Sequence, residues 1–239
     1  MIRFVYPSKN KIMKKQLFLL VAFSIVFVTT ALAQHQRYSI KNGIGIYGGL
    51  TQFDIITDNF QTVKGEGWLG GLSATVDLPH KWYTVSYNIQ LSENNVGVFA
   101  RPSNVIANEE EIDYKLFTAQ VAFLFHAKVL QDYITVDVGP MIQYNSELEL
   151  KDDNHENYII GSYNNLLAKD ITGISQFNVN GAVGATAGFK GFKLRAQYIY
   201  GFTNMLNKLN NNNDLDTTGG NNKFKGNQSM LAFTAIIVF

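Results

Sequence analysis

Apolar and polar side chains alternate along most of the chain beyond residue 43. The clearest case is YTVSYNIQL at residues 83–91, where tyrosine, valine, isoleucine and leucine share one face and threonine, serine, asparagine and glutamine share the other. Successive side chains of a β-strand point to opposite faces, so this period of two predicts a strand with one apolar face. Helices are not expected, because no long segment carries an apolar stripe with a period of 3.6 residues.

Eight segments of this kind are joined by connections of alternating length. The segments are residues 44–53, 68–78, 83–91, 117–125, 134–144, 177–189, 192–203 and 231–239. The expected long connections are residues 54–67, 99–111, 151–173 and 204–227, and the short ones are 79–81, 128–132 and 190–191. This layout is typical of bacterial outer-membrane barrels. It predicts an all-β fold, an eight-stranded antiparallel up-and-down transmembrane β-barrel with its turns and both termini in the periplasm.

The first 33 residues have the character of an export signal. A basic start at 13–15 precedes an apolar stretch at 17–28 and a small-x-small cleavage site at 31–33. Residues 1–12 are then an upstream extension, and the start codon, Met1 or Met13, stays open. Retention of the apolar stretch as an anchor is disfavoured, because a spanning helix needs about 20 apolar residues. We expect a signal peptide at 1–33 and an outer-membrane barrel domain at 34–239.

Removal of residues 1–33 changes the charge of the chain. The full sequence has 20 Lys and Arg and 19 Asp and Glu; five of the basic residues and none of the acidic ones precede residue 34, which leaves 15 and 19, formally −4. Such a balance gives no reason to expect nucleic acid as a partner. The absence of cysteine excludes disulfides, thiolate metal sites and a lipid-modified N-terminal cysteine. No cofactor is expected.

Aromatic residues mark the end of the chain and the edges of the expected membrane span. Phe239 closes an alternating apolar segment that also contains Phe233. A terminal aromatic strand resembles the signal that the outer-membrane insertion machinery recognises. Trp68 and Trp82 lie near the ends of their segments, where an amphipathic ring suits a membrane interface. The expected location is the outer membrane, with its lipid and the insertion machinery as partners.

Several segments together resemble one known family. NGIGIYGGL, LGGLSATVDLP, GAVGATAGF, the export signal and the terminal phenylalanine look like the outer-membrane β-barrel domain family typified by PorT. The likeness spans the whole chain after the export signal. It implies a barrel without catalytic residues, a link to type IX protein secretion, and secretion or other envelope proteins as partners.

Four charged side chains are expected inside the barrel. Asp77, Asp137, Lys193 and Arg195 fall on polar faces within a few residues of the periplasmic turns. An eight-stranded barrel has room for little more than its own side chains, and charges in such an interior must pair. We therefore expect a structural charge network at this end and no wide aqueous pore. A proton or ion path is the alternative.

Catalytic and metal-binding residues are not indicated. The four histidines do not cluster along the sequence, so neither a metal site nor a Ser-His pair is expected. The histidines are His35, His80, His126 and His155. The alternative is a small lipid-modifying enzyme with catalytic residues at the outer rim. Its candidate residues are His155, Ser162, and Asp152 or Asp153.

The loops leave several roles open. Acidic runs at 109–111 and 151–153 could hold divalent cations, although a solvated rim is the commoner case. The asparagine-rich residues 204–227 fit a lid, a receptor surface or flexible chain. A secreted lipocalin-like barrel would alternate equally well, with its apolar face turned inward around a ligand. The favoured function is a non-enzymatic outer-membrane barrel with a structural or interaction role.

Overall fold

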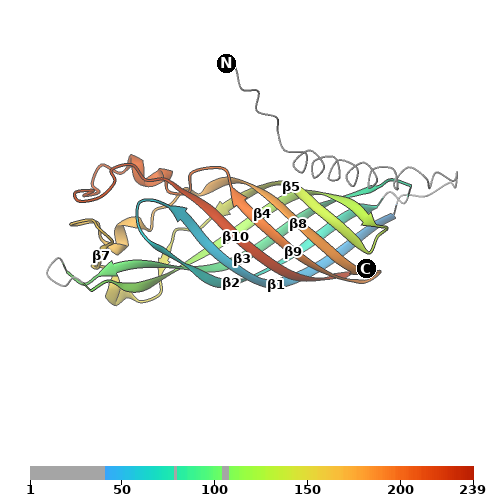
Figure 1. The fold of residues 1–239 in the computed structure, drawn as a ribbon, viewed down its shortest axis with the longest axis horizontal. Helices are drawn as coiled ribbons and strands as arrows, with labels where there is room; N and C mark the ends of the chain where they lie inside the picture. Colours follow the sequence, from blue (N-terminus) through green and yellow to red (C-terminus); the bar gives the residue numbers. More distant parts are fainter. Residues whose placement is uncertain (1–40, 78–79, 104–107) are drawn as a thin grey trace, which may run out of the picture.

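The computed structural model describes residues 41–77, 80–103 and 108–239. Eight long strands form one closed antiparallel ring, which Figure 1 shows from the side. Each long strand pairs with the next one in chain order, and the last pairs with the first. The strands are β1 (Lys41–Thr57), β2 (Thr62–Asp77), β3 (Tyr83–Arg101), β4 (Glu110–Leu130), β5 (Ile134–Asn145), β8 (Phe177–Phe189), β9 (Phe192–Gly201) and β10 (Gly226–Val238). The predicted eight-stranded up-and-down barrel is confirmed, while the predicted signal peptide lies outside the described residues.

Shorter elements lie beyond the ring at one end. They are β6 (Glu149–Leu150), β7 (Ile159–Ile160), and the 3-10 helices η1 (Asp153–His155), η2 (Ala168–Ile171) and η3 (Asn207–Asn211). In Figure 1 the longer loops gather at the left and the tight turns at the right, beside the C-terminus. These two ends are called the loop end and the turn end below. Within the described ranges, no helix is long and apolar enough to span a membrane.

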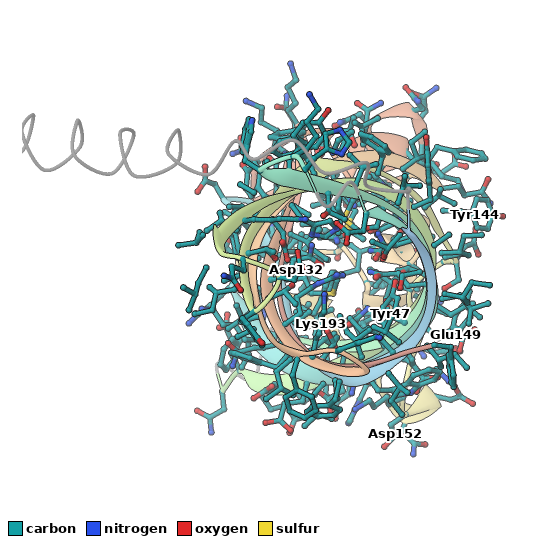
Figure 2. All side chains as sticks on the ribbon, turned by 90° about the vertical axis from the view of Figure 1, so that its right-hand side faces the viewer. Tyr47, Asp132, Tyr144, Glu149, Asp152 and Lys193 are labelled. Atoms are coloured by element: carbon teal, nitrogen blue, oxygen red, sulfur yellow. The ribbon has the colours of Figure 1, made fainter. Side chains whose placement is uncertain are left out.

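The apolar faces of the strands point outward and the polar faces point into the lumen. On β3, Tyr87 is 57% exposed and its neighbour Asn88 is 1% exposed. Figure 2, a view into the turn end, shows Tyr47 inside the ring and Tyr144 outside it. A lipocalin-like barrel would place its apolar face inside. That alternative is therefore wrong for the described strands.

Aromatic side chains border the outer aliphatic band at both ends. On β8, Phe177 and Phe189 are both exposed at the two strand ends, with aliphatic or small residues on the outward face between them. At the turn end, Trp82 packs edge-on against Phe125 with ring centroids 5.4 Å apart. Trp68 lies exposed toward the loop end of β2. Aromatic girdles on either side of an apolar band are the pattern of membrane-spanning barrels.

The predicted long connection 54–67 is wrong, because β1 and β2 run through most of it, whereas the connection between β3 and β4 lies within the predicted residues 99–111. Residues 58–61 alone join β1 to β2, and residues 102–109 join β3 to β4. Side-chain polarity reverses in this region, so that the inward positions are apolar and many outward ones are charged. The inward apolar residues are Phe53, Ile55, Val96, Val98, Ile112, Tyr114 and Leu116. The barrel thus continues beyond the apolar band as a water-facing fold with an ordinary apolar core.

The connections between β5 and β8 and between β9 and β10 pack over the loop end as a cap. The cap residues that join the inward apolar strand residues in one core are Leu148, Ile160, Tyr163, Leu166, Ala168, Ile171, Ile174, Met205, Leu206, Leu209 and Phe224. Tyr163 links three segments: its ring stacks on Phe224, its hydroxyl donates to the Asn221 carbonyl at 2.9 Å, and Asn59 Nδ2 donates to it at 3.3 Å. The asparagine-rich connection is therefore part of a packed cap.

The turn end is built from tight connections. Residues 131–133 join β4 to β5, and residues 190–191 join β8 to β9. Gly191 has a φ of +102°, a backbone conformation that favours glycine. These short connections leave the strand ends, and the lumen between them, uncovered by long loops within the described chain.

Candidate functional site

Four glutamine side chains form a hydrogen-bonded belt across the lumen. Gln90 on β3 donates to Gln120 on β4, which donates in turn to Gln143 on β5. Gln143 also donates to Oε1 of Gln228 on β10. Because β8 and β9 separate β5 from β10 in the ring, this last bond crosses the interior. The belt occupies the lumen with paired amides, as a barrel of this size requires.

Asp137 is the centre of a polar network on the turn-end side of this belt. Its side chain is fully buried and accepts hydrogen bonds from His126 Nδ1 and Thr135 Oγ1, both at 2.7 Å. Thr186 donates to its second oxygen. The Arg195 Nε lies 3.5 Å from that same oxygen, with only 8% of the arginine side chain exposed. A buried ion pair with further hydrogen bonds is the arrangement in which an interior charge is tolerated.

The four charged residues expected inside the barrel do not form a single network. Asp137 and Arg195 form one ion pair, whereas Asp77 pairs with Lys128, whose Nζ donates to Asp77 Oδ1 at 2.7 Å. Lys128 is not among the residues predicted to lie inside the barrel, because it falls in an expected turn, whereas β4 continues to Leu130. Lys193 lines the same end of the lumen but forms no ion pair with a described residue. The expected single network is thus two clusters and one unpaired lysine.

His126 also contacts a serine, which corrects the expectation that no Ser-His pair exists. Its Nε2 lies 2.7 Å from Ser86 Oγ, so Ser86, His126 and Asp137 follow the order of a hydrolase triad. Ser86 is 1% exposed, does not line the turn-end cavity, and accepts a 2.8 Å hydrogen bond from Asn88. A catalytic serine must be reached by its substrate. This chain of hydrogen bonds therefore fits a structural role in the interior.

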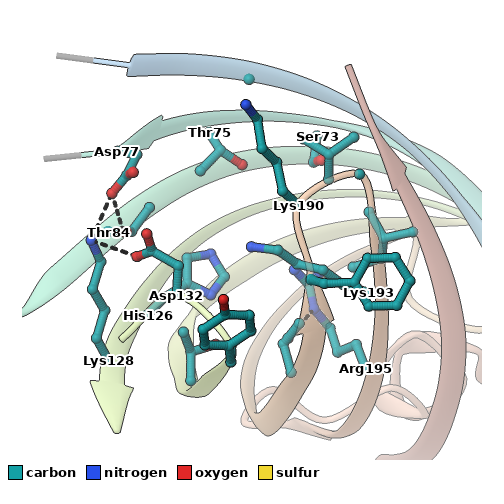
Figure 3. A pocket seen from close by; sticks show the side chains of 18 of the residues that line it. Ser73, Thr75, Asp77, Thr84, His126, Lys128, Asp132, Lys190, Lys193 and Arg195 are labelled. Atoms are coloured by element: carbon teal, nitrogen blue, oxygen red, sulfur yellow. Dashed lines mark hydrogen bonds and ion pairs between the residues drawn. The ribbon is translucent and has the colours of Figure 1, made fainter. Parts of the chain in front are cut away.

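A cavity of about 580 Å³ lies at the turn end, within the size range of small-molecule sites. Its charged lining residues are Asp77, Lys128, Asp132, Lys190, Lys193 and Arg195. Figure 3 shows Lys128 held between its two acidic partners, at 2.7 Å and 2.9 Å. The side chains of Ser73 and Thr75 on β2 also line the cavity. Charged and hydroxyl groups therefore surround a space large enough for a ligand.

The rim residues considered for a lipid-modifying enzyme are not assembled into a site. The His155 ring packs against Tyr158 with centroids 4.7 Å apart, and Asp152 accepts the Asn154 N–H at 3.0 Å to cap η1, which begins at Asp153. No hydrogen bond joins His155 to Ser162 in the part of the chain that the structure describes. The described residues also contain no group of three or more His, Asp and Glu side chains placed to hold a metal ion.

Phe233 and Phe239, the residues expected to act in membrane insertion, both face outward. Their side chains are 57% and 76% exposed. The Phe239 N–H donates to the Ile44 carbonyl at 2.9 Å, so the chain end is held where β10 meets β1. The structure thus leaves both rings open to lipid or to a partner.

No family model matches the chain, and no curated protein matches it. The crystal structure of Neisserial surface protein A is similar to this chain, with 10% sequence identity and a TM-score of 0.44. The match covers 84% of this chain and 100% of that protein's chain. Ail, the attachment invasion locus protein of Yersinia pestis, has 11% identity and a TM-score of 0.39, over 83% and 99%. The outer membrane protein OprG from Pseudomonas aeruginosa has 9% identity and a TM-score of 0.41, over 83% and 96%. No role is carried over from these proteins, and the fold follows from the chain's own strand pairing.

Proposed function

We propose that this chain is an integral protein of the bacterial outer membrane with a non-enzymatic structural or interaction role. The observation that carries the proposal is the division of side chains around the ring, with aliphatic and aromatic groups outside and hydrogen-bonded polar groups inside. Soluble proteins rarely expose a contiguous apolar patch of more than a few hundred Å². Lipid tails would cover this outer face in a bilayer, where only helices and closed barrels satisfy every backbone polar group.

The two ends of the barrel give the proposed orientation. Short turns belong to the periplasmic side of such barrels and long loops to the outside. The turn-end cavity and the C-terminus therefore face the periplasm, and the cap faces the exterior. The glutamine belt and the apolar core of the cap both support a role other than conduction.

The absence of catalysis is also part of the proposal. Burial of Ser86 and the separation of His155 from Ser162 support it. A lipase and acyltransferase assay on the purified wild type and the Ser86→Ala and His155→Ala variants tests it. We expect all three proteins to give background rates. Turnover by the wild type that either substitution abolishes would contradict a non-enzymatic role.

Membrane placement is tested by fractionation. We expect the protein to sediment with outer membranes, to resist extraction by urea, and to migrate differently on a gel before and after boiling. Crosslinking in intact outer membranes followed by affinity capture would then identify envelope partners. Folded, monodisperse protein in the supernatant of a detergent-free lysate would contradict the membrane proposal.

A more specific role in type IX protein secretion is proposed on the sequence resemblance to the PorT-type family. The periplasmic cavity and the external cap are two surfaces on which secretion proteins could assemble. Deleting the gene and measuring the export of type IX cargo tests this role. Loss of export that the wild-type gene restores would support it, and normal export would remove it without affecting the placement of the barrel.

A further inference from the structure

The turn-end cavity contains two lysines that have no ion-pair partner among the described residues. Lys190 lies in the β8–β9 turn, Lys193 lies early in β9, and both line the cavity (Figure 3). Neither forms an ion pair with any residue in the described ranges. The two acidic residues that line the cavity, Asp77 and Asp132, are both engaged by Lys128. Four basic and two acidic side chains line the cavity, so its side-chain lining carries more positive than negative charge.

Arg195 adds further donors to the same wall. Its Nε donates to Thr186 Oγ1 at 3.1 Å and lies 3.5 Å from Asp137. Its two terminal nitrogens have no hydrogen-bond partner among the described residues. The side chain is only 8% exposed, so protein contacts hold the guanidinium in place. A fixed guanidinium with unused N–H groups is well suited to an oxyanion.

Two hydroxyl groups on β2 complete the set of donors. Ser73 and Thr75 both line the cavity, and neither side chain makes a hydrogen bond with a described residue. Ser73 is 5% exposed, and a polar side chain buried to that degree usually has a partner. Its hydroxyl is therefore available to a group that enters the cavity.

We propose that this cavity binds the phosphate group of a small molecule or lipid. Two ammonium groups, a guanidinium and two hydroxyls match an anionic phosphate group with several acceptor oxygens. The volume of about 580 Å³ exceeds what an inorganic ion needs, so the phosphate would belong to a larger molecule. That molecule is a soluble phosphate ester or the head group of a phospholipid. This inference rests on the proposed function only in placing the cavity on the periplasmic side.

Calorimetric titration of the purified full-length barrel in nonionic detergent at low salt tests the inference. The probes are inorganic phosphate, glycerol 3-phosphate and short-chain phosphatidylglycerol, with short-chain phosphatidylcholine, whose own ammonium offsets its phosphodiester, as the zwitterionic control. Lys193→Gln should raise the Kd about tenfold, the effect of losing one charge-assisted hydrogen bond. Ser73→Ala should raise it by a smaller factor. The matched control is Lys208→Gln at the loop end, where the ammonium pairs with Glu147 at 3.0 Å.

The binding data are compared only for variants that keep the heat-modifiable migration of the wild type, since this migration shows that the barrel has folded. Saturable binding of glycerol 3-phosphate that is tighter than that of inorganic phosphate and is weakened by Lys193→Gln supports a soluble ester. Binding of phosphatidylglycerol alone, weakened by the same substitution, supports a lipid head group. No saturable binding of any probe, or equal Kd values for the wild type and Lys193→Gln, would overturn the proposal. Fractionation with outer membranes is measured separately, so the two proposals can fail independently.

Discussion

The Asp137 carboxylate lies 2.7 Å from His126 Nδ1, in a lumen lined mainly by uncharged polar groups. The two residues are directly opposite one another on β4 and β5. Because Asp137 has no exposed surface, only protein groups compensate its charge. His126 at 2.7 Å and Arg195 at 3.5 Å are the two nitrogen groups that face it, and Asp137 is the one acidic partner of Arg195 among the described residues.

Asp137→Asn should strongly destabilise the barrel, because it leaves the buried Arg195 charge uncompensated. Removing one partner of a buried pair costs about 3–5 kcal/mol. Urea titration of the protein folded in lipid vesicles would measure the change in free energy of unfolding. Asp132→Asn is the control, since that side chain is 64% exposed and its pair with Lys128 should be worth less than about 1 kcal/mol. Equal unfolding curves for the two variants would contradict the proposed role of Asp137.

Ile89→Arg should impair folding into a bilayer. Ile89 is 61% exposed in the outer apolar band, and an arginine at the midplane of a barrel costs about 2–4 kcal/mol. The measurement is the fraction of urea-denatured protein that refolds into vesicles. Gln52→Arg is the matched control, because Gln52 is exposed on β1 opposite Glu66 of β2, where the outward side chains are polar. If both variants refold like the wild type, lipid does not contact the band.

Tyr163→Ala should loosen the cap while leaving the membrane-spanning part of the barrel intact. The tyrosine is fully buried, and truncating a buried aromatic ring costs about 3 kcal/mol or more. Limited proteolysis of vesicle-embedded protein should show faster cleavage within residues 146–176 and 202–225. Tyr163→Phe keeps the stack on Phe224 and loses only the hydroxyl contacts, so its effect should be about 1 kcal/mol. Wild-type cleavage rates in Tyr163→Ala would show that this ring does not hold the cap.

Acid should weaken a second link in the cap. Hydrogen bonds from the Thr218 side chain, from Asn165 and from the Thr218 N–H lower the pKa of the Asp216 carboxyl from 3.8 to about 2. Since the folded state favours the ionised form, its contribution is complete above the ordinary pKa and is lost as the pH falls through about 2. Pepsin cleavage within residues 214–220 should therefore be slower in the wild type than in Asp216→Asn near pH 4, and the difference should be much smaller near pH 2. A difference that does not change with pH would contradict this assignment.

The sequence predicts the faces of the strands wherever lipid covers one side. Residues 83–91 alternate correctly, but β3 continues to Arg101. Val96 and Val98 point inward just as Asn88 does, because the period of two is unbroken. Only the polarity is reversed, since the lumen becomes an apolar core beneath the cap. If apolar side chains are assumed to face lipid throughout, the predicted end of β3 therefore falls too early in the sequence.

Contacts between strands could not be predicted in the same way. The contact between His126 and Ser86 depends on a register that places Thr84 opposite His126. The pair formed by Asp77 and Lys128 depends likewise on how β2, β3 and β4 align. Alternation assigns each residue to a face but does not fix its height along the barrel. Alternation therefore predicts four of the charged residues at the turn end, but neither Lys128 nor the pairing of the charges.

The bond between Gln143 and Gln228 has a consequence for the shear of the cylinder. If β10 slipped along β1 by two residues, every side chain would keep its proper face, so neither lipid nor lumen would oppose the slip. The slip would carry Gln228 about 7 Å away from its partner and break the amide link across the interior. The hydrogen bond between Gln143 and Gln228 therefore favours one stagger of β10 along β1 over others that would leave every side chain on the same face.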